Sequence, residues 1–167
     1  DKLAVLEAMV RRADVVCVGG AMAYTFLRAQ GQPVGSSLVE AERIEDAQRI
    51  LAAARDSGHR LLLPVDHVVA QKLEAGADAK VVREIPDGWM GLDIGPQTVI
   101  AFRGEIAKAA LVLWNGPMGV FEMKPFSSGT FEVAKALAES KGTTIVGGGD
   151  SVAAISEAGL IDRISHV

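Results

Sequence analysis

The 167-residue sequence has one cysteine, Cys17, and few aromatic residues, which make up 5% of it. A single cysteine can form neither an internal disulfide nor an all-cysteine metal site. Basic residues are also few, because 17 lysines and arginines stand against 21 acidic residues, for a formal charge of -4. Such a balance lacks the positive surface typical of nucleic-acid-binding proteins. We therefore expect no nucleic-acid partner.

Long apolar runs are missing as well. No uninterrupted stretch is long enough to span a bilayer, and the first residues, Asp1-Lys2-Leu3, do not resemble a secretory signal. We expect no association with membranes and a cytoplasmic location. Hydrophobic residues nevertheless make up 49% of the chain, which is enough to build the core of one globular domain of this length.

Short apolar runs alternate with longer amphipathic stretches along the chain. The runs predict strands at residues 15–18, 61–63, 111–114 and 144–146, with a weaker candidate of the same kind at 81–82. Apolar residues at helical spacing predict helices over residues 44–54, after Pro96, over 131–138, and from Val152 to Gly159. This alternation is typical of an α/β fold with three layers, in which helices cover both faces of a mostly parallel sheet. Residues 84–97, rich in proline and glycine, are expected to form an irregular loop.

Three of the predicted strands end in glycine-rich turns, at residues 19–21, 115–119 and 147–150. In open parallel sheets, ligands bind beyond the carboxyl ends of the strands. Glycine lets the backbone approach a ligand closely, and the free N–H groups at a helix start can hold a phosphate. One tight turn between a strand and a helix needs glycine with or without a ligand. Three such turns predict a phosphate or nucleotide site.

Asp150 follows the last of these turns and admits two interpretations. Aspartate is a common helix N-cap, where its carboxylate accepts an N–H bond from the first turn. A carboxylate beside a phosphate-binding turn can equally be a ligand for Mg²⁺, which binds few protein carboxylates and completes its shell with water and phosphate. The spacing of the residues favours neither role.

Other catalytic motifs are missing. The sequence contains no phosphate loop ending in Gly-Lys-Ser/Thr, no dinucleotide fingerprint of three spaced glycines, and no nucleophile elbow. His59, His67 and His166 lie far apart without metal-ligand spacing, and we expect structural roles for them. Trp89 and Trp114 are expected to be packing residues, and Cys17 a small core residue.

Five segments occur in an order that carries a family resemblance: residues 18–27, 63–66, 89–96, 114–122 and 147–151. The most specific reads Trp-Asn-Gly-Pro-Met-Gly-Val-Phe-Glu. Together they resemble the C-terminal, nucleotide-binding domain of phosphoglycerate kinase over residues 1–167. The resemblance implies a Rossmann-like domain and reversible phosphoryl transfer between 1,3-bisphosphoglycerate and MgADP, which gives 3-phosphoglycerate and MgATP in glycolysis. It implies Mg²⁺ as cofactor and ATP/ADP as substrate, with the glycerate bound by an N-terminal domain.

The resemblance also assigns roles to single residues. Gly20, Ala21, Leu38, Gly91 and Leu92 are expected to line the adenine pocket, Pro117 and Val120 to flank the nucleoside, and Glu122 to bind the ribose hydroxyls. Asn115 and Gly116 are expected near the phosphates, with Gly147, Gly148, Gly149 and Ser151 at the start of a helix that faces them. Asp150 is expected to hold Mg²⁺. Catalytic roles fall to Lys2, Gly148 and Gly149, which neutralise and align the phosphates.

The sequence departs from the family pattern in three places. It begins inside the Gly-Ala-Lys-x-x-Asp-Lys motif, of which Lys2 is the second lysine, and it stops before a glycine-rich segment. Ala21 stands where the family has a third glycine. We therefore expect residues 1–167 to be one domain, truncated at both ends and lacking the glycerate-binding domain. We expect this domain to be a monomer that binds nucleotide without turnover. A non-catalytic nucleotide-binding module stays open, as does a dinucleotide oxidoreductase, which the absent glycine fingerprint disfavours.

Overall fold

The computed structural model describes residues 2–167. The helices are α1 (Lys2–Val10), α2 (Gly20–Ala29), α3 (Ile44–Ser57), α4 (Pro96–Lys108), α5 (Ser128–Glu139) and α6 (Gly149–Glu157). The strands are β1 (Val15–Val18), β2 (Arg60–Leu62), β3 (His67–Ala70), β4 (Ala79–Val82), β5 (Met90–Ile94), β6 (Leu111–Asn115) and β7 (Thr143–Gly147). Short 3-10 turns lie at Ala41–Arg43, Lys124–Phe126 and Ile161–Arg163.

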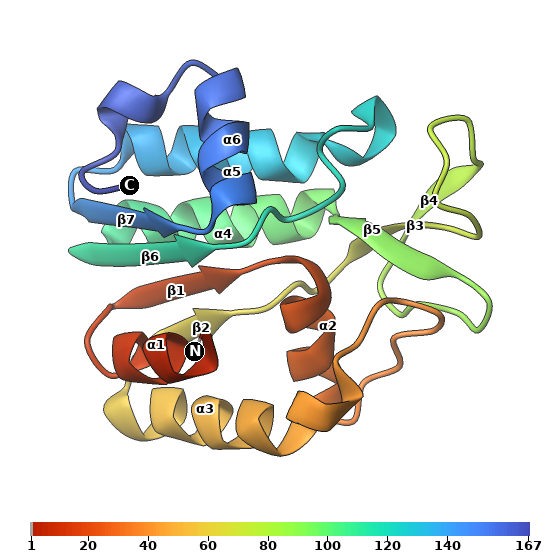
Figure 1. Cartoon of the computed structure of the whole chain (residues 1–167), viewed down its shortest axis with the longest axis horizontal. Coiled ribbons are helices and arrows are strands. Elements are labelled where there is room, and N and C mark those ends of the chain that lie inside the picture. The colour runs from red at the N-terminus through yellow and green to blue at the C-terminus, as the bar shows by residue number, and fades with distance from the viewer. Residues whose placement is uncertain (1) are drawn as a thin grey trace.

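Four strands form a parallel sheet in the order β2-β1-β6-β7. Helices α1 and α3 lie on one side of this sheet, and α4, α5 and α6 lie on the other (Figure 1). The predicted α/β fold with three layers is therefore confirmed, as are its four parallel strands. Within residues 2–167, no helix has both the length and the apolar character needed to cross a membrane.

Each face of the sheet has its own apolar core. One core joins the strands to α4, α5 and α6 around Trp114, Phe102 and Leu137. The other joins them to α1, α2 and α3 around Phe26 and Ile50. Because both faces are covered, strand β1 is buried along its whole length, which is why its sequence is continuously apolar rather than alternating. Cys17 is fully buried in this strand, as expected of a core residue.

A second, antiparallel sheet with the order β4-β3-β5 was not predicted. The expectation that residues 84–97 form an irregular loop is wrong, because β5 lies inside them. Gly91 lies in this strand, and a Cβ atom there would collide with the Tyr24 side chain. The residues at 81–82 belong to the antiparallel strand β4, not to the parallel sheet.

Helix boundaries follow the expected signals. Pro96 occupies the first turn of α4 directly after Gly95, a position where its missing N–H costs no hydrogen bond. Helix α6 ends just before Gly159, whose φ of 74° lies in the left-handed region that glycine adopts readily. These signals confirm the helix expected after Pro96 and the helix expected to end at Gly159.

Two isoleucines on α4 allow a test of how much burial in the core contributes to the free energy of unfolding. Ile106 is fully buried, whereas Ile100 is 65% exposed. Replacing Ile106 by alanine leaves a cavity and is expected to lower the free energy of unfolding by about 2–5 kcal/mol. The matched change Ile100→Ala is expected to stay within about 0.5 kcal/mol. Urea titration of both variants measures the difference, and equal losses would contradict this assignment of the core face.

Candidate functional site

The glycine-rich turns lie at one edge of the parallel sheet, where β1, β6 and β7 end (Figure 1). A cavity of about 440 Å³ opens there. Nine residues predicted for the nucleotide site line it: Gly20, Ala21, Leu38, Gly91, Leu92, Pro117, Val120, Glu122 and Asp150. They come from segments up to 130 positions apart in the sequence, from Gly20 to Asp150, and the fold brings them around a single space.

Other residues around this cavity were not assigned from the sequence. These are Tyr24, Ser36, Leu73, Met90, Met118, Gly119 and Phe121. Five of them stand inside the segments that carry the family resemblance, so that signal could have found them: Tyr24, Met90, Met118, Gly119 and Phe121. Leu73 lies between β3 and β4 and has no such signal, because its position depends on the antiparallel sheet.

A smaller cavity of about 270 Å³ adjoins the first. It shares Gly20, Ala21 and Pro117 with the larger one and adds Asn115 and Gly116. The Asn115 side chain lies beneath the turn before α6, since a Cβ on Gly148 would be 3.2 Å from its Oδ1. Its Oδ1 is buried and has no hydrogen-bond partner among the described residues. A buried acceptor in this state calls for a donor from a ligand, an ion or water.

The start of α6 distinguishes the two interpretations of Asp150. The N-cap of this helix is Gly148, with φ 92°, and no side chain caps it. Asp150 lies in the first turn, is exposed and faces the cavity. The N-cap interpretation of Asp150 is therefore wrong, and its carboxylate is available on the cavity wall.

Ser151 differs from its neighbours at the helix start. Gly148 and Gly149 are exposed, whereas Ser151 is fully buried. Its hydroxyl accepts a 2.8 Å bond from the N–H of Gly116. The Ser151 side chain therefore ties α6 to the turn after β6, and Gly147 ends β7 just before them. Lys2 begins α1, but its side chain lies outside the described part of the structure.

Hydrogen bonds from the loop before α3 shape the far wall of the cavity. The N–H of Gly91 donates to Ser37 Oγ at 2.8 Å, and the N–H of Ser36 donates to the Trp89 carbonyl at 2.8 Å. These bonds hold Leu38 beside β5, although its side chain is 77% exposed. Leu73 is 49% exposed at the same cavity. The exposed apolar side chains of Leu38 and Leu73 thus border the opening of the cavity, where they can contact a flat ligand.

The donor set suits magnesium better than a metal that needs several protein ligands. Within residues 2–167, no group of three or more histidine, cysteine or acidic side chains could hold a metal ion. Asp150 and Glu122 are the acidic residues that line the cavity. Mg²⁺ commonly takes one or two carboxylates and fills its shell with water and substrate phosphates, so Asp150 at the cavity wall fits that ion.

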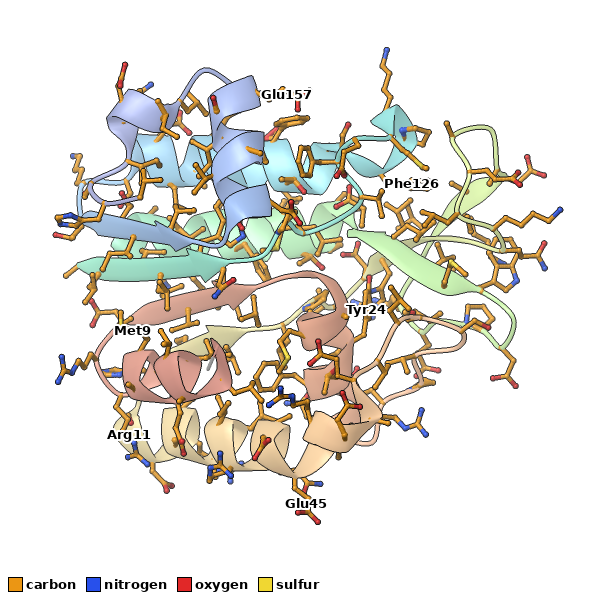
Figure 2. All side chains as sticks on the ribbon, viewed as in Figure 1. Met9, Arg11, Tyr24, Glu45, Phe126 and Glu157 are labelled. Atoms are coloured by element: carbon orange, nitrogen blue, oxygen red, sulfur yellow. The ribbon has the colours of Figure 1, made fainter. Side chains whose placement is uncertain are left out.

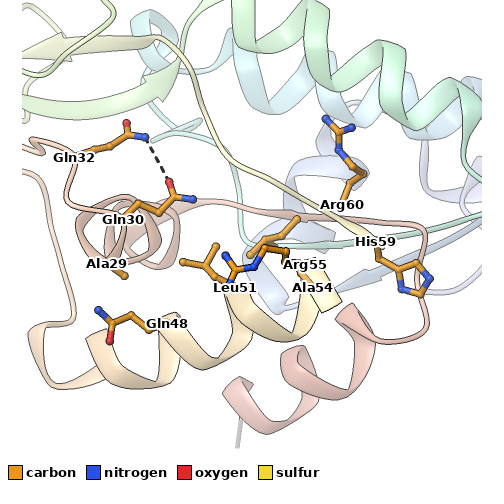
Figure 3. A pocket seen from close by; sticks show the side chains of 10 residues that line it. Ala29, Gln30, Gln32, Gln48, Leu51, Ala54, Arg55, His59 and Arg60 are labelled. Carbon is orange, nitrogen blue, oxygen red and sulfur yellow. Dashed lines mark hydrogen bonds between the residues drawn. The ribbon is translucent and has the colours of Figure 1, made fainter. Parts of the chain in front are cut away.

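A larger cavity, of about 660 Å³, lies elsewhere on the molecule. Figure 3 shows it between the end of α2, helix α3 and strand β2. Three of its polar side chains already have partners: Gln32 Nε2 lies 3.4 Å from Gln30 Oε1, and His59 Nδ1 lies 2.9 Å from the Val10 carbonyl. It contains none of the predicted site residues and does not lie at the carboxyl ends of the strands. The 440 Å³ cavity is therefore the better candidate site.

Comparison with known proteins gives the family of the chain. The family model for phosphoglycerate kinase matches residues 1–167. The chain belongs to the phosphoglycerate kinase family. It is 58% identical to the phosphoglycerate kinase of Anaeromyxobacter dehalogenans over 169 residues, and covers 43% of that protein. It is 54% identical to that of Thermosipho africanus, with the same coverage.

Solved structures give the same family. The structure of phosphoglycerate kinase from Coxiella burnetii matches with a TM-score of 0.92 at 40% identity, over 99% of this chain and 44% of the other. That of Pyrococcus horikoshii matches with a TM-score of 0.80 at 32% identity, over 98% of this chain and 42% of the other. The chain therefore spans less than half the length of these relatives. Family membership gives no support to the oxidoreductase alternative.

Two buried ionisable groups lie behind the cavity. Burial raises the pKa of Asp93 to about 7, against the opposing effect of backbone N–H bonds from Gly129 and Ile94. Burial lowers the pKa of His67 to about 4, and Asp66 opposes that shift. The His67 ring lies 5.8 Å from that of Tyr24, and its Nδ1 has no hydrogen-bond partner among the described residues. His67 is thus buried against an aromatic ring with its hydrogen bonding incomplete.

His67 makes the stability of the fold depend on pH. The unfolded chain binds a proton at this histidine below about pH 6.5, whereas the folded protein does so only near pH 4. Stability is therefore lost as the pH falls through this window. Relative to the parent chain, His67→Phe is expected to gain about 2 kcal/mol on going from pH 8 to pH 5. Chemical denaturation at both pH values measures this gain, and a difference that stays constant with pH would contradict it.

Proposed function

We propose that this chain binds MgADP and MgATP in the 440 Å³ cavity and forms the nucleotide-binding half of a phosphoglycerate kinase. One observation carries the proposal. Nine residues that the family resemblance assigns to the nucleotide surround one space at the carboxyl ends of the parallel strands. A space of this size suits a nucleoside, since small-molecule sites occupy roughly 300–1,000 Å³.

The base and ribose occupy the apolar part of the cavity. Gly20 and Ala21 leave room for a flat purine beside Gly91, and Leu38 and Leu92 contact its faces. Pro117 and Val120 flank the nucleoside, and Glu122, exposed at the cavity edge, accepts hydrogen bonds from the ribose hydroxyls. The methyl group of Ala21 is small enough to be accommodated beside the base.

The phosphates lie toward α6 and the smaller cavity. Backbone N–H groups at the start of a helix attract anions through their partial positive charge. Gly148 and Gly149 expose this backbone, and Lys2 supplies a cation in the proposed site. The unpartnered Asn115 Oδ1 accepts a hydrogen bond from an ammonium group or from water on the metal. Asp150 holds Mg²⁺, which neutralises charge on the phosphate oxygens when it is bound.

The reaction of the whole enzyme needs alignment rather than acid–base chemistry from this domain. The phosphoryl group leaves the acyl oxygen of 1,3-bisphosphoglycerate and joins a β-phosphate oxygen of ADP, which gives 3-phosphoglycerate and ATP. The attacking oxygen is already anionic, so no side chain has to remove a proton. Catalysis of this kind rests on positioning and charge neutralisation, which glycine N–H groups and Lys2 provide.

The remaining parts of the proposal concern the longer protein. The chain covers 43% of its relatives, and the glycerate is assigned to a separate N-terminal domain. The proposed enzyme is a cytoplasmic monomer that works in glycolysis and closes its two domains over the substrates to exclude water.

The metal role of Asp150 can be tested by calorimetry. Asp150→Asn removes the charge that holds Mg²⁺, so MgADP is expected to bind about tenfold more weakly while metal-free ADP loses much less. Glu157→Gln is the matched control, because Glu157 is an exposed residue at the other end of the same helix (Figure 2). Equal losses for ADP with and without Mg²⁺ would count against the metal role.

The chain alone is expected to bind nucleotide without turning it over. Purified residues 1–167, supplied with 1,3-bisphosphoglycerate and MgADP, should form no ATP above the uncatalysed rate, because no second domain is present to hold the glycerate. A coupled ATP assay checks this, with an intact phosphoglycerate kinase as positive control. A measurable enzymatic rate from the chain alone would refute this part of the proposal.

A further inference from the structure

Asp93 is a buried carboxylate directly behind the cavity wall. It follows Leu92 in β5 and is 1% exposed. Its Oδ2 accepts a 2.9 Å hydrogen bond from the N–H of Gly129, in the first turn of α5. Its Oδ1 accepts a 2.8 Å bond from the N–H of Ile94. A carboxylate in this position joins the strand to the start of the helix.

Two glycines make room for this carboxylate. A Cβ atom on Gly119 would lie 2.6 Å from Asp93 Oδ1, and one on Gly129 would collide with the same oxygen. The backbone of the loop after β6 therefore packs directly on the Asp93 side chain. Neither glycine has a positive φ, so close packing rather than backbone conformation accounts for the missing side chains.

Further hydrogen bonds close a ring around Asp93. The N–H of Val120 donates to the Leu92 carbonyl at 2.9 Å, and the N–H of Gly119 donates to Thr130 Oγ1 at 3.2 Å. The ring thus runs from β5 to the loop, from the loop to α5, and back through Asp93 to β5. Residues 117–122 of the loop form one wall of the cavity, so the ring sets where that wall lies.

We propose that Asp93 is a positioning residue for the nucleoside pocket, whose ionised carboxylate holds the loop of residues 117–122 in its binding position against β5. This inference rests on the proposed function, because it concerns the same cavity. Asp93 does not line the cavity and acts through Gly119, Gly129 and Leu92. Hydrogen bonds to a charged acceptor are stronger than those to a neutral one, so loss of the charge loosens the wall.

Among the described titratable groups behind the cavity wall, Asp93 is the one whose charge changes near neutral pH. Tyr24 of α2 faces it, and burial together with the Asp93 charge raises the pKa of that phenol well above its usual range. His67 of β3 has a pKa lowered to about 4, and Asp66 precedes it. The first turn of α5 contains no acidic residue, and Glu122 lies on the loop itself. The pKa of Asp93, raised to about 7, places its titration between pH 6 and 8.

Asp66 provides a matched control. It is also buried, at 3% exposure, and it binds a helix start through bonds of 3.0 and 2.9 Å from the N–H groups of Gln97 and Thr98. That helix is α4, and neither Asp66 nor residues 95–98 line the cavity. Asp66→Asn therefore weakens a similar anchor without moving the cavity wall.

The test measures adenosine binding to the chain by calorimetry from pH 6 to pH 8. Adenosine carries no phosphate, so neither a phosphate nor Mg²⁺ titrates with the protein. The parent chain is expected to bind several-fold more weakly at pH 6 than at pH 8. Asp93→Asn is expected to bind about tenfold more weakly at pH 8 and to show no change with pH, because an amide cannot ionise and turns a donor toward one N–H. Asp66→Asn should keep the parent affinity and pH profile.

Amide hydrogen exchange gives a second readout in the ligand-free chain. The protection factors of Gly119 and Val120 should fall between pH 8 and pH 6 in the parent chain, and Asp66→Asn should leave that fall in place. If Asp93→Asn binds adenosine like the parent at every pH, the inference is overturned while the proposed function stands. If adenosine does not bind the parent chain, the proposed function fails. Amide hydrogen exchange then tests the role of Asp93 by itself: a fall in protection at Gly119 and Val120 supports that role, and constant protection overturns it.

Discussion

A buried carboxylate that accepts two main-chain N–H groups lies directly behind the wall of the proposed nucleoside pocket. Asp93 joins β5 to the start of α5, and the loop after β6 packs between them. The antiparallel sheet also meets the rest of the domain through apolar contacts around Tyr24 and Val69, through Asp66 at α4, and through backbone bonds such as that from Val120 to Leu92. Apolar contacts are not directional, whereas hydrogen bonds to a carboxylate fix distance and orientation. The pocket wall therefore owes its geometry to polar groups inside the protein.

The polar end of the site follows from the direction of the strands. Because β1, β6 and β7 are parallel, their glycine-rich ends gather at one edge. Helix α6 begins there and presents unpaired N–H groups beside Asp150. Ser151 binds the turn after β6, which keeps the helix start next to Asn115. The proposed phosphate site thus combines fixed backbone dipoles with one exposed carboxylate, an arrangement suited to an anion that arrives with its own metal.

The parallel half of the fold could be predicted from the sequence, and the antiparallel half could not. Strands such as Val15–Val18 are continuously apolar because both faces are buried, and this pattern is visible in the residues. Strand β5 contains Gly91 and Asp93, which are rare in strands. Both are explained by tertiary contacts, with Tyr24 in one case and Gly129 in the other. Leu73 was missed at the site for the same reason, since the antiparallel sheet brings it there.

Most of the residues predicted to bind the nucleotide were identified by the family resemblance and not by the chemistry of the residues themselves. The spacing of residues allowed Asp150 to be either a helix N-cap or a Mg²⁺ ligand. The structure excludes the first role, because Gly148 is the N-cap of α6. The roles of Ser151 and Asp93 could not be predicted from the sequence. The sequence does not show whether a hydroxyl or a carboxylate faces a ligand or accepts a hydrogen bond from the backbone. Burial distinguishes the two cases, and burial is a property of the folded chain.

The close packing of glycines on carboxylates restricts how this region can change over generations. Gly119 and Gly129 both touch Asp93, and Gly95 touches Asp66 in the same way. Any side chain at these glycines displaces an oxygen that already has a partner, and a shorter residue at either aspartate leaves N–H groups unsatisfied. A replacement at one member of such a pair is therefore expected to lower the stability of the fold. A change at one member then favours a compensating change at its neighbour, since the glycine and the carboxylate share one space.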